Sequence, residues 1–137
     1  MIELSRGTYD DIVYHAYAGR DEEVCGVLAG EYGEDHSRIT ETYEAENTAD
    51  TPQIRYLIDP EAQFEIIEQI EDSGLEVVGF YHSHPTGPTQ PSETDLDRAM
   101  WPDYSYVICA LDGYPFLGSW RYRDEAGAFD QELVAIN

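Results

Sequence analysis

The sequence predicts an α+β fold, with mixed α/β character, in a single domain that spans residues 1–137. Three observations predict it. Short apolar or alternating runs recur along the whole chain, as expected for β-strands. Segments with helical periodicity interrupt these runs near the start, in the middle and after residue 91. The length of 137 residues suits one hydrophobic core and is too short for two.

The first third of the chain is predicted to contain three strands and one helix. Residues 2–4 can form a short strand, and residues 8–19 a helix with Thr8 as its N-cap. The continuous apolar run 24–30, which ends at a glycine, predicts a buried strand. Residues 38–46 alternate between apolar and polar side chains, which indicates a half-buried strand.

The middle of the chain contains the clearest helix of the sequence. A loop at 47–53 and a predicted strand at 54–59 precede it. Asp59 suits the N-cap position with a proline directly after it, and Ser73-Gly74 marks the end. The apolar stripe of this helix is predicted from Phe64, Ile66, Ile67 and Ile70.

The last part of the chain is predicted to be mostly strands. Residues 75–84 form a strand, residues 85–91 a loop with three prolines, and residues 92–100 a short helix. Three further strands are predicted, at 104–111, 115–123 and 128–136, with Asp112-Gly113 as a turn between the first two.

The charge of the chain is strongly negative. Asp and Glu number 29 against seven basic residues, all of them arginine, for a net charge of −22. Nucleic acid is therefore excluded as a partner, because binding it depends on neutralising phosphates. The acids are dispersed rather than gathered in a tail, which favours a halophilic protein whose self-repulsion is screened by salt. The alternative is an ordinary acidic protein with a basic partner.

Features of a membrane or secreted protein are not expected. The N-terminal residues have no basic or apolar segment of a signal peptide, and no apolar run approaches the length of about 18 residues that spans a bilayer. Cys25 and Cys109 both lie in apolar runs, so we expect buried free thiols rather than a disulfide. These observations favour the cytoplasm.

Two of the four histidines lie one residue apart, at the end of an apolar run. Side chains alternate along a strand, so His82 and His84 are expected to point to the same side, and Ser83 to the other. With Asp95 they can hold a catalytic metal that keeps an open fourth position, where a bound water becomes a nucleophile. The alternative is that Ser92 and Asp95 merely begin a helix as a capping box.

A family resemblance favours the metal. The run His82-Ser83-His84-Pro85, followed by Ser92 and Asp95, resembles the H-S-H-P-x(6)-S-x-x-D signature of the JAMM/MPN+ metalloprotease family, in its small stand-alone prokaryotic or archaeal type. This family also carries a glutamate in an E-x-x-G context at the start of an apolar strand. Glu23 with Gly26 matches that pattern, whereas Glu22 is one position out of register.

The resemblance covers most of the chain and implies both a fold and a chemistry. The fold is cytidine-deaminase-like, a curved mixed sheet flanked by two main helices, with a short helix after the metal loop. The chemistry is that of a zinc peptidase with one Zn²⁺ per chain, held by His82, His84 and Asp95. Glu23 would accept a proton from the attacking water and return it to the leaving amine. Ser92 would donate a hydrogen bond to the oxyanion.

The implied function is an isopeptidase that cleaves after the C-terminal Gly-Gly of ubiquitin-like or sulfur-carrier proteins and releases them from target lysines, as deubiquitinase-like and desampylase-like enzymes do. The alternative is a peptidase that removes cysteine or another amino acid from a sulfur-carrier C-terminus, because 21–30 resembles relatives of that type. A scaffold without catalysis and a RadC-like protein are less favoured. Trp101 and Tyr104 could line a groove for the modifier's tail, but we expect them in the core.

Overall fold

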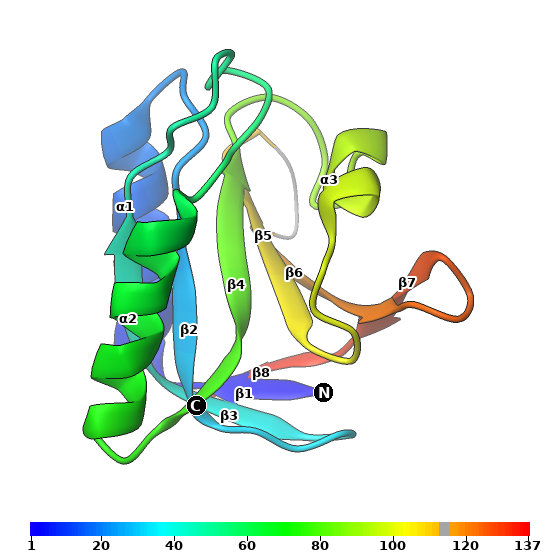
Figure 1. Cartoon of the computed structure of the whole chain (residues 1–137). Helices are drawn as coiled ribbons and strands as arrows, with labels where there is room; N and C mark the ends of the chain where they lie inside the picture. The colour runs from blue at the N-terminus through cyan, green and yellow to red at the C-terminus, as the bar shows by residue number, and fades with distance from the viewer. Residues whose placement is uncertain (113–115) are drawn as a thin grey trace.

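A computed structural model describes residues 1–112 and 116–137, and Figure 1 shows the arrangement of the elements. Within the described residues the strands form one mixed sheet in the order β7-β6-β5-β4-β2-β3-β1-β8. The strands are β1 (Ile2–Leu4), β2 (Cys25–Glu31), β3 (Ser37–Ala45), β4 (Glu76–His84), β5 (Ser105–Ala110), β6 (Leu117–Arg123), β7 (Ala128–Glu132) and β8 (Val134–Ile136). The helices are α1 (Arg6–Gly19), α2 (Pro60–Asp72) and α3 (Glu93–Arg98). The predicted α+β class is confirmed.

The two longer helices cover opposite faces of the sheet (Figure 1). On one face, Ile12 and Ala16 of α1 pack in a cluster with Val78 and Tyr81 of β4. On the other face, Ile70 of α2 packs in a second cluster that includes Phe80 of β4. The central strand β4 therefore lies between both cores, which holds its C-terminal end rigidly in place.

The cap predicted for the first helix is wrong. The helix begins at Arg6, with Ser5 as N-cap, whose Oγ accepts a hydrogen bond from the backbone N–H of Thr8 at 3.1 Å. Thr8 instead lies buried in the first turn, and its hydroxyl is 3.0 Å from that of Ser5. Serine and threonine both suit the N-cap position. Thr8 is buried inside the first turn, so Ser5 takes that position. The strands predicted at 2–4, 24–30 and 38–46 are confirmed, with bounds shifted by no more than one residue.

Residues 54–59 are not a strand, contrary to the prediction. Their backbone groups are bonded by a loop side chain: the amide of Asn47 donates to the carbonyl of Arg55 at 2.9 Å and accepts from the N–H of Leu57 at 3.0 Å. An asparagine that bridges backbone groups in this way offers the chain an alternative to a sheet ladder. The segment crosses the sheet face and buries Ile58 against it.

The predicted capping of α2 is confirmed, but the prediction that Phe64 belongs to its buried apolar stripe is wrong. Asp59 caps the helix and Ser73 ends it, followed by Gly74 with a φ of 83°. Ile70 is buried and Ile66 and Ile67 are partly buried against the core. Phe64 is 62% exposed, because it lies on the side of α2 that faces away from the sheet.

The C-terminal part differs from the prediction in two places. The helix predicted at 92–100 is shorter, because Ala99 adopts extended backbone angles and ends it. The strand predicted at 128–136 is two strands, since the chain leaves β6 near Leu133 and pairs in parallel with β1. The strands predicted at 104–111 and 115–123 are present as β5 and β6, whereas the predicted turn at Gly113 and the start of the second strand at Pro115 lie outside the described residues.

Both cysteines, Cys25 and Cys109, are buried free thiols, as predicted. Among the residues that the structure describes, no helix is both long and apolar enough to cross a lipid bilayer.

Candidate metal centre

Pairing of β2 with β4 brings Glu23 to the histidines, although about 60 residues separate them in sequence. In the antiparallel register, Cys25 lies opposite His82. Directly before β2, the N–H of Val24 donates to the Oγ of Ser83 at 2.9 Å, and the N–H of Ser83 donates to the carbonyl of Val24 at 3.0 Å. Continuing this register places Glu23 beside His84. Ser83 thus joins the two strands and does not face the cluster.

Close packing explains why a glycine, Gly26, follows Glu23 by three residues. A Cβ atom on Gly26 would come within 2.3 Å of the Tyr81 ring and within 2.5 Å of the Tyr43 carbonyl oxygen. No side chain fits there unless the backbone shifts, which would move the start of β2. The E-x-x-G pattern therefore couples an acid at the site to a strand that can approach its neighbours closely.

His82, His84 and Asp95 meet at one point. The Nε2 atoms of the two histidines are 3.2 Å apart, and Asp95 Oδ2 lies 3.1 Å from that of His82 and 3.2 Å from that of His84. Both histidines lie at the C-terminal end of β4, and their side chains point to the same side of the strand, as the alternation predicts. Asp95 comes from the first turn of α3, whose capping box orients its carboxylate: Oδ2 accepts from the N–H of Ser92 at 2.9 Å.

The donor set fits a metal ion. His84 Nδ1 lies 2.8 Å from the carbonyl oxygen of Pro88, an acceptor, so the ring proton belongs on Nδ1 and the lone pair of Nε2 faces Asp95. The Nε2 lone pair of His84 and the carboxylate of Asp95 repel unless a proton or a metal cation lies between them. Ligand atoms around a tetrahedral zinc at 2.0–2.1 Å would be about 3.3 Å apart, close to the observed spacing.

Glu23 is the fourth member of the cluster. One of its carboxylate oxygens lies within 4.8 Å of a donor atom of each of His82, His84 and Asp95. Its side chain is buried, and Oε1 has no hydrogen-bond partner among the described residues. Burial raises the pKa of Glu23 to about 7, the nearby Asp95 adds to this, and only His84 opposes it. A carboxylate with its pKa near neutrality can accept and return a proton.

The other three pKa values reflect the crowding of the same groups. Burial lowers the pKa of His82 below its ordinary value. Burial also disfavours the charged form of His84, but the Asp95 carboxylate and the Pro88 carbonyl outweigh it and raise the pKa of His84. For Asp95, burial is outweighed by the two imidazoles, which hold its pKa well below the usual range. Asp95 is thus anionic at any physiological pH, as a metal ligand must be.

Ser92 borders a cavity of about 260 Å³ together with Glu23 and His84. Its Oγ accepts a hydrogen bond from the N–H of Asp95 at 3.1 Å, so the predicted role as helix cap is observed. This bond uses the oxygen as acceptor and leaves the hydroxyl hydrogen to be donated into the cavity. The two roles considered for Ser92 are therefore compatible.

Sequence interpretation missed Tyr56 and Pro88. The Tyr56 ring stacks on His82, with centroids 4.4 Å apart and planes at 21°. Tyr56 was assigned to a strand, which gave no reason to place it at the site. The signal that could have identified Tyr56 is its position shortly after the polar, turn-rich residues 47–53. An aromatic residue in such a loop is a candidate for a functional site.

The pKa of Glu23 predicts a measurable change in stability. In the metal-free protein, the folded state keeps a proton on Glu23 up to about pH 7, whereas the unfolded chain releases it near 4.5. Stability from this group therefore falls as pH rises between those values. We expect metal-free Glu23→Gln to exceed the wild type in free energy of unfolding by about 1–3 kcal/mol at pH 8 and to match it at about pH 4, below the pKa of the unfolded chain. Urea titrations in chelator measure the difference.

The matched control for this measurement is Glu22→Gln, which changes an exposed neighbouring acid. It should show no pH-dependent difference from the wild type. Equal unfolding free energies of Glu23→Gln and the wild type at both pH values would contradict the raised pKa.

The mixed sheet carries helices on both faces, and two imidazoles and two carboxylates that could hold a metal ion gather at the C-terminal end of β4. The sequence profile described as prokaryotic homologs of the JAB domain matches residues 5–123. The chain belongs to this family, and the resemblance stated from its motifs is confirmed. Its fold is similar to that of a JAB1/MPN domain protein from Archaeoglobus fulgidus, with a TM-score of 0.62 at 17% identity over 100% of this chain and 97% of that one.

Three relatives with assigned names are similar over most of their length. A desampylase of Haloferax volcanii is 42% identical, over 87% of each chain. A probable TtuB-protein conjugate cleaving protease of Thermus thermophilus is 30% identical, over 82% of this chain and 72% of the relative. A CysO-cysteine peptidase of Mycobacterium bovis is 34% identical, over 91% of this chain and 84% of the relative.

Proposed function

We propose that this chain is a zinc-dependent isopeptidase that hydrolyses the bond after the C-terminal Gly-Gly of ubiquitin-like or sulfur-carrier proteins and releases them from lysines of target proteins. The observation that carries the proposal is the position of Glu23. A buried carboxylate with an unpaired oxygen lies within 4.8 Å of two imidazoles and an aspartate. A structural metal site has no need for such a base, whereas hydrolysis requires one.

Each residue of the site has a distinct task. His82, His84 and Asp95 would hold one Zn²⁺, which would supply a Lewis acid and lower the pKa of water. Glu23 takes the proton from the attacking water and passes it to the leaving amine, because its buried carboxylate lies at the cluster and keeps one oxygen without a partner among the described residues. Ser92 donates its hydroxyl hydrogen to the carbonyl oxygen as negative charge develops there. The pairing of Pro88 with His84 keeps the Nε2 lone pair directed at the site.

The names of the relatives support the substrate class. The desampylase and the conjugate-cleaving protease are similar to this chain through nearly the whole domain. The CysO-cysteine peptidase supports a second candidate, the removal of cysteine or another amino acid from a sulfur-carrier C-terminus. The two reactions share the same bond chemistry and differ only in the leaving amine. The isopeptidase is preferred because the relative of highest identity among the three is the desampylase.

The test is to supply a ubiquitin-like protein joined through its C-terminal Gly-Gly to a lysine of a second protein, and to follow release of the free modifier. We expect release that stops in chelator and returns when Zn²⁺ is added back. A sulfur-carrier protein with cysteine added at its C-terminus, assayed in parallel, separates the two candidates. Equal cleavage with and without chelator, or none with Zn²⁺ present, would contradict the proposal.

A further inference from the structure

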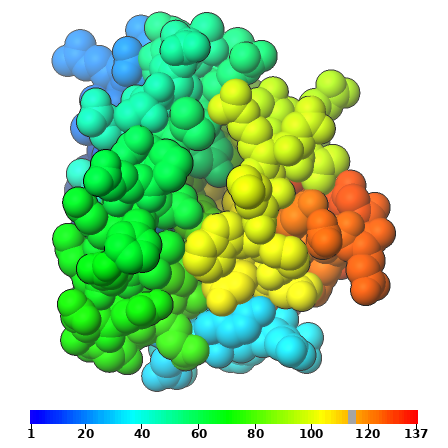
Figure 2. Space-filling model, in the orientation of Figure 1, coloured from blue at the N-terminus to red at the C-terminus, as the bar shows by residue number. Residues whose placement is uncertain are grey.

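The loop between β4 and α3, residues 85–91, carries the carbonyl group that orients His84. Pro88 supplies this carbonyl, whose oxygen lies 2.8 Å from His84 Nδ1. The same loop forms one wall of the cavity of about 260 Å³ that Ser92 borders. In the space-filling view, the yellow-green segment that follows β4 lies at the surface, opposite the teal-green segment that precedes α2 (Figure 2). The position of the loop therefore determines both the orientation of a candidate ligand and the shape of the cavity.

Two hydrogen bonds join this loop to other described residues. One is the bond between His84 and Pro88, and the other runs from the indole Nε1–H of Trp120, in β6, to the carbonyl oxygen of Thr89 at 2.8 Å. Three of the seven loop residues are prolines, which have no backbone N–H to donate. The loop is thus attached through its carbonyl groups, and Trp120 provides the attachment that comes from outside the candidate metal site.

A glycine in β6 lets the loop approach this strand closely. A Cβ atom on Gly118 would come within 3.0 Å of the Thr89 carbonyl oxygen and within 3.2 Å of the Thr89 Cβ atom. Gly118 pairs with Ile108 of β5, and Ile108 pairs with His82 of β4, so the three residues form one row across the sheet. Trp120 is two residues further along β6, on the same side. Two positions on one face of β6 therefore contact Thr89, one by leaving room and the other by donating a hydrogen bond.

The contact at Thr89 restricts the carbonyl group of Pro88. The two carbonyl groups belong to neighbouring planar peptide units, so only the φ and ψ angles of Thr89 separate them. The Pro88 carbonyl in turn keeps the ring proton of His84 on Nδ1 and the Nε2 lone pair toward Asp95. The contacts thus run without a gap from the indole of Trp120 to a candidate metal ligand.

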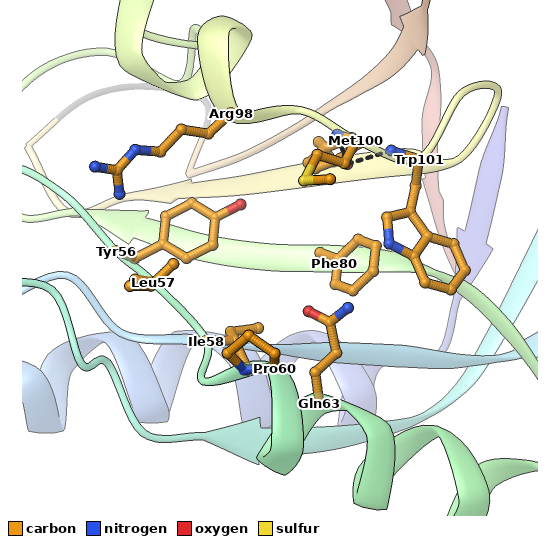
Figure 3. A pocket seen from close by; sticks show the side chains of 10 residues that line it. Tyr56, Leu57, Ile58, Pro60, Gln63, Phe80, Arg98, Met100 and Trp101 are labelled. Atoms are coloured by element: carbon orange, nitrogen blue, oxygen red, sulfur yellow. Dashed lines mark hydrogen bonds between the residues drawn. The ribbon is translucent and has the colours of Figure 1, made fainter.

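The second tryptophan offers a matched comparison. Trp101 was expected in the core rather than in a groove, and it does both: it packs on Phe80, with ring centroids 5.3 Å apart, and lines an apolar pocket of about 360 Å³ (Figure 3). Tyr104 packs on Trp101 and on Tyr32, as a core position implies. The indole N–H of Trp101 has no hydrogen-bond partner in the described part of the chain, unlike that of Trp120.

We propose that Trp120 is a positioning residue of the metal centre: its indole N–H holds the loop at Thr89, so that the Pro88 carbonyl keeps His84 in the orientation that binds the ion. The inference rests on the proposed function, because it takes His84 as a ligand of Zn²⁺. Loss of a residue that orients a ligand typically weakens metal binding by about 10–100-fold. Since Trp120 acts through the loop, we expect the lower end of this range.

The test compares the Zn²⁺ affinities of the wild type, Trp120→Phe and Trp101→Phe, each prepared without metal and titrated in competition with a chromogenic chelator. Phenylalanine keeps an aromatic ring and lacks the N–H, so Trp120→Phe should bind Zn²⁺ about tenfold more weakly. Trp101→Phe should bind Zn²⁺ as the wild type does, even where urea unfolding shows an equal loss of stability in both variants. Hydrogen-exchange NMR of the metal-free wild type should show slow exchange of the Trp120 indole N–H and fast exchange of that of Trp101.

The outcomes separate this inference from the proposed function. An unchanged Zn²⁺ affinity in Trp120→Phe overturns the positioning role and leaves the isopeptidase intact. Equal losses of affinity in both tryptophan variants, or rapid exchange of the Trp120 indole N–H, also overturn it, because the effect would then follow from stability alone or the hydrogen bond would be absent. A tenfold weaker affinity in Trp120→Phe alone, with a wild type that cleaves no conjugate, upholds the positioning role and overturns the isopeptidase.

Discussion

Glu23→Gln is expected to lower kcat by about 10²–10⁴ while the metal content stays near one per chain, because general acid–base catalysis contributes that range. Glutamine preserves the size and shape of the side chain and cannot take up the proton of the attacking water. The position next to His84 is set by strand pairing rather than by the carboxylate, so the metal ligands should not move. Single-turnover cleavage of a lysine-linked ubiquitin-like conjugate and metal analysis of the same preparation measure the two quantities.

Glu22→Gln supplies the matched control, since it removes the same charge from an exposed side chain one residue away. Its kcat should equal that of the wild type. A Glu23→Gln protein with full metal content and nearly full activity would show that the proton is handled elsewhere. Loss of the metal in Glu23→Gln would instead make Glu23 a ligand and not a base.

The candidate metal triad could be predicted from sequence because its members are close together in the chain. His82 and His84 need only the two-residue period of a strand, and Asp95 needs only a capping box at the next helix. Glu23 had no local signal: a glutamate in an acidic run is usually a surface residue, and only the family motif singled it out. Its placement depends on the register of β2 against β4, which pairing between distant segments decides and no local pattern encodes.

The apolar pocket lined by Tyr56 and Leu57 could not be predicted, because the local pattern of these residues indicates a different structure from the one they adopt. Residues 54–59 have the alternation of a strand, yet Asn47 satisfies their backbone groups and turns Tyr56 and Leu57 into a wall. Phe64 was assigned to the core by helical period, but α2 lies on the sheet at an angle that buries Ile70 and exposes Phe64. Periodicity fixes which residues share a side, and tertiary packing decides which side is covered.

Asp95→Asn is expected to weaken metal binding by at least about 100-fold and to abolish chelator-sensitive activity, with little change in folding. The loss of affinity follows because the amide oxygen is neutral, whereas the two imidazoles of His82 and His84 need an anionic partner to complete the set. Folding should survive because an asparagine oxygen can still accept the N–H of Ser92, so the capping box that starts α3 persists. Isothermal titration with Zn²⁺ measures the affinity, and urea unfolding of the metal-free protein measures the stability.

Asp97→Asn is the comparison that isolates the effect, because Asp97 carries the same charge on the same helix and is exposed. It should bind Zn²⁺ as the wild type does. If Asp95→Asn binds Zn²⁺ with unchanged affinity, then Asp95 serves only the helix start, and two histidines with Glu23 must hold the ion. That outcome would also remove the base from the mechanism, because a carboxylate engaged as ligand cannot carry the proton, so the two substitutions together decide how the acids divide their roles.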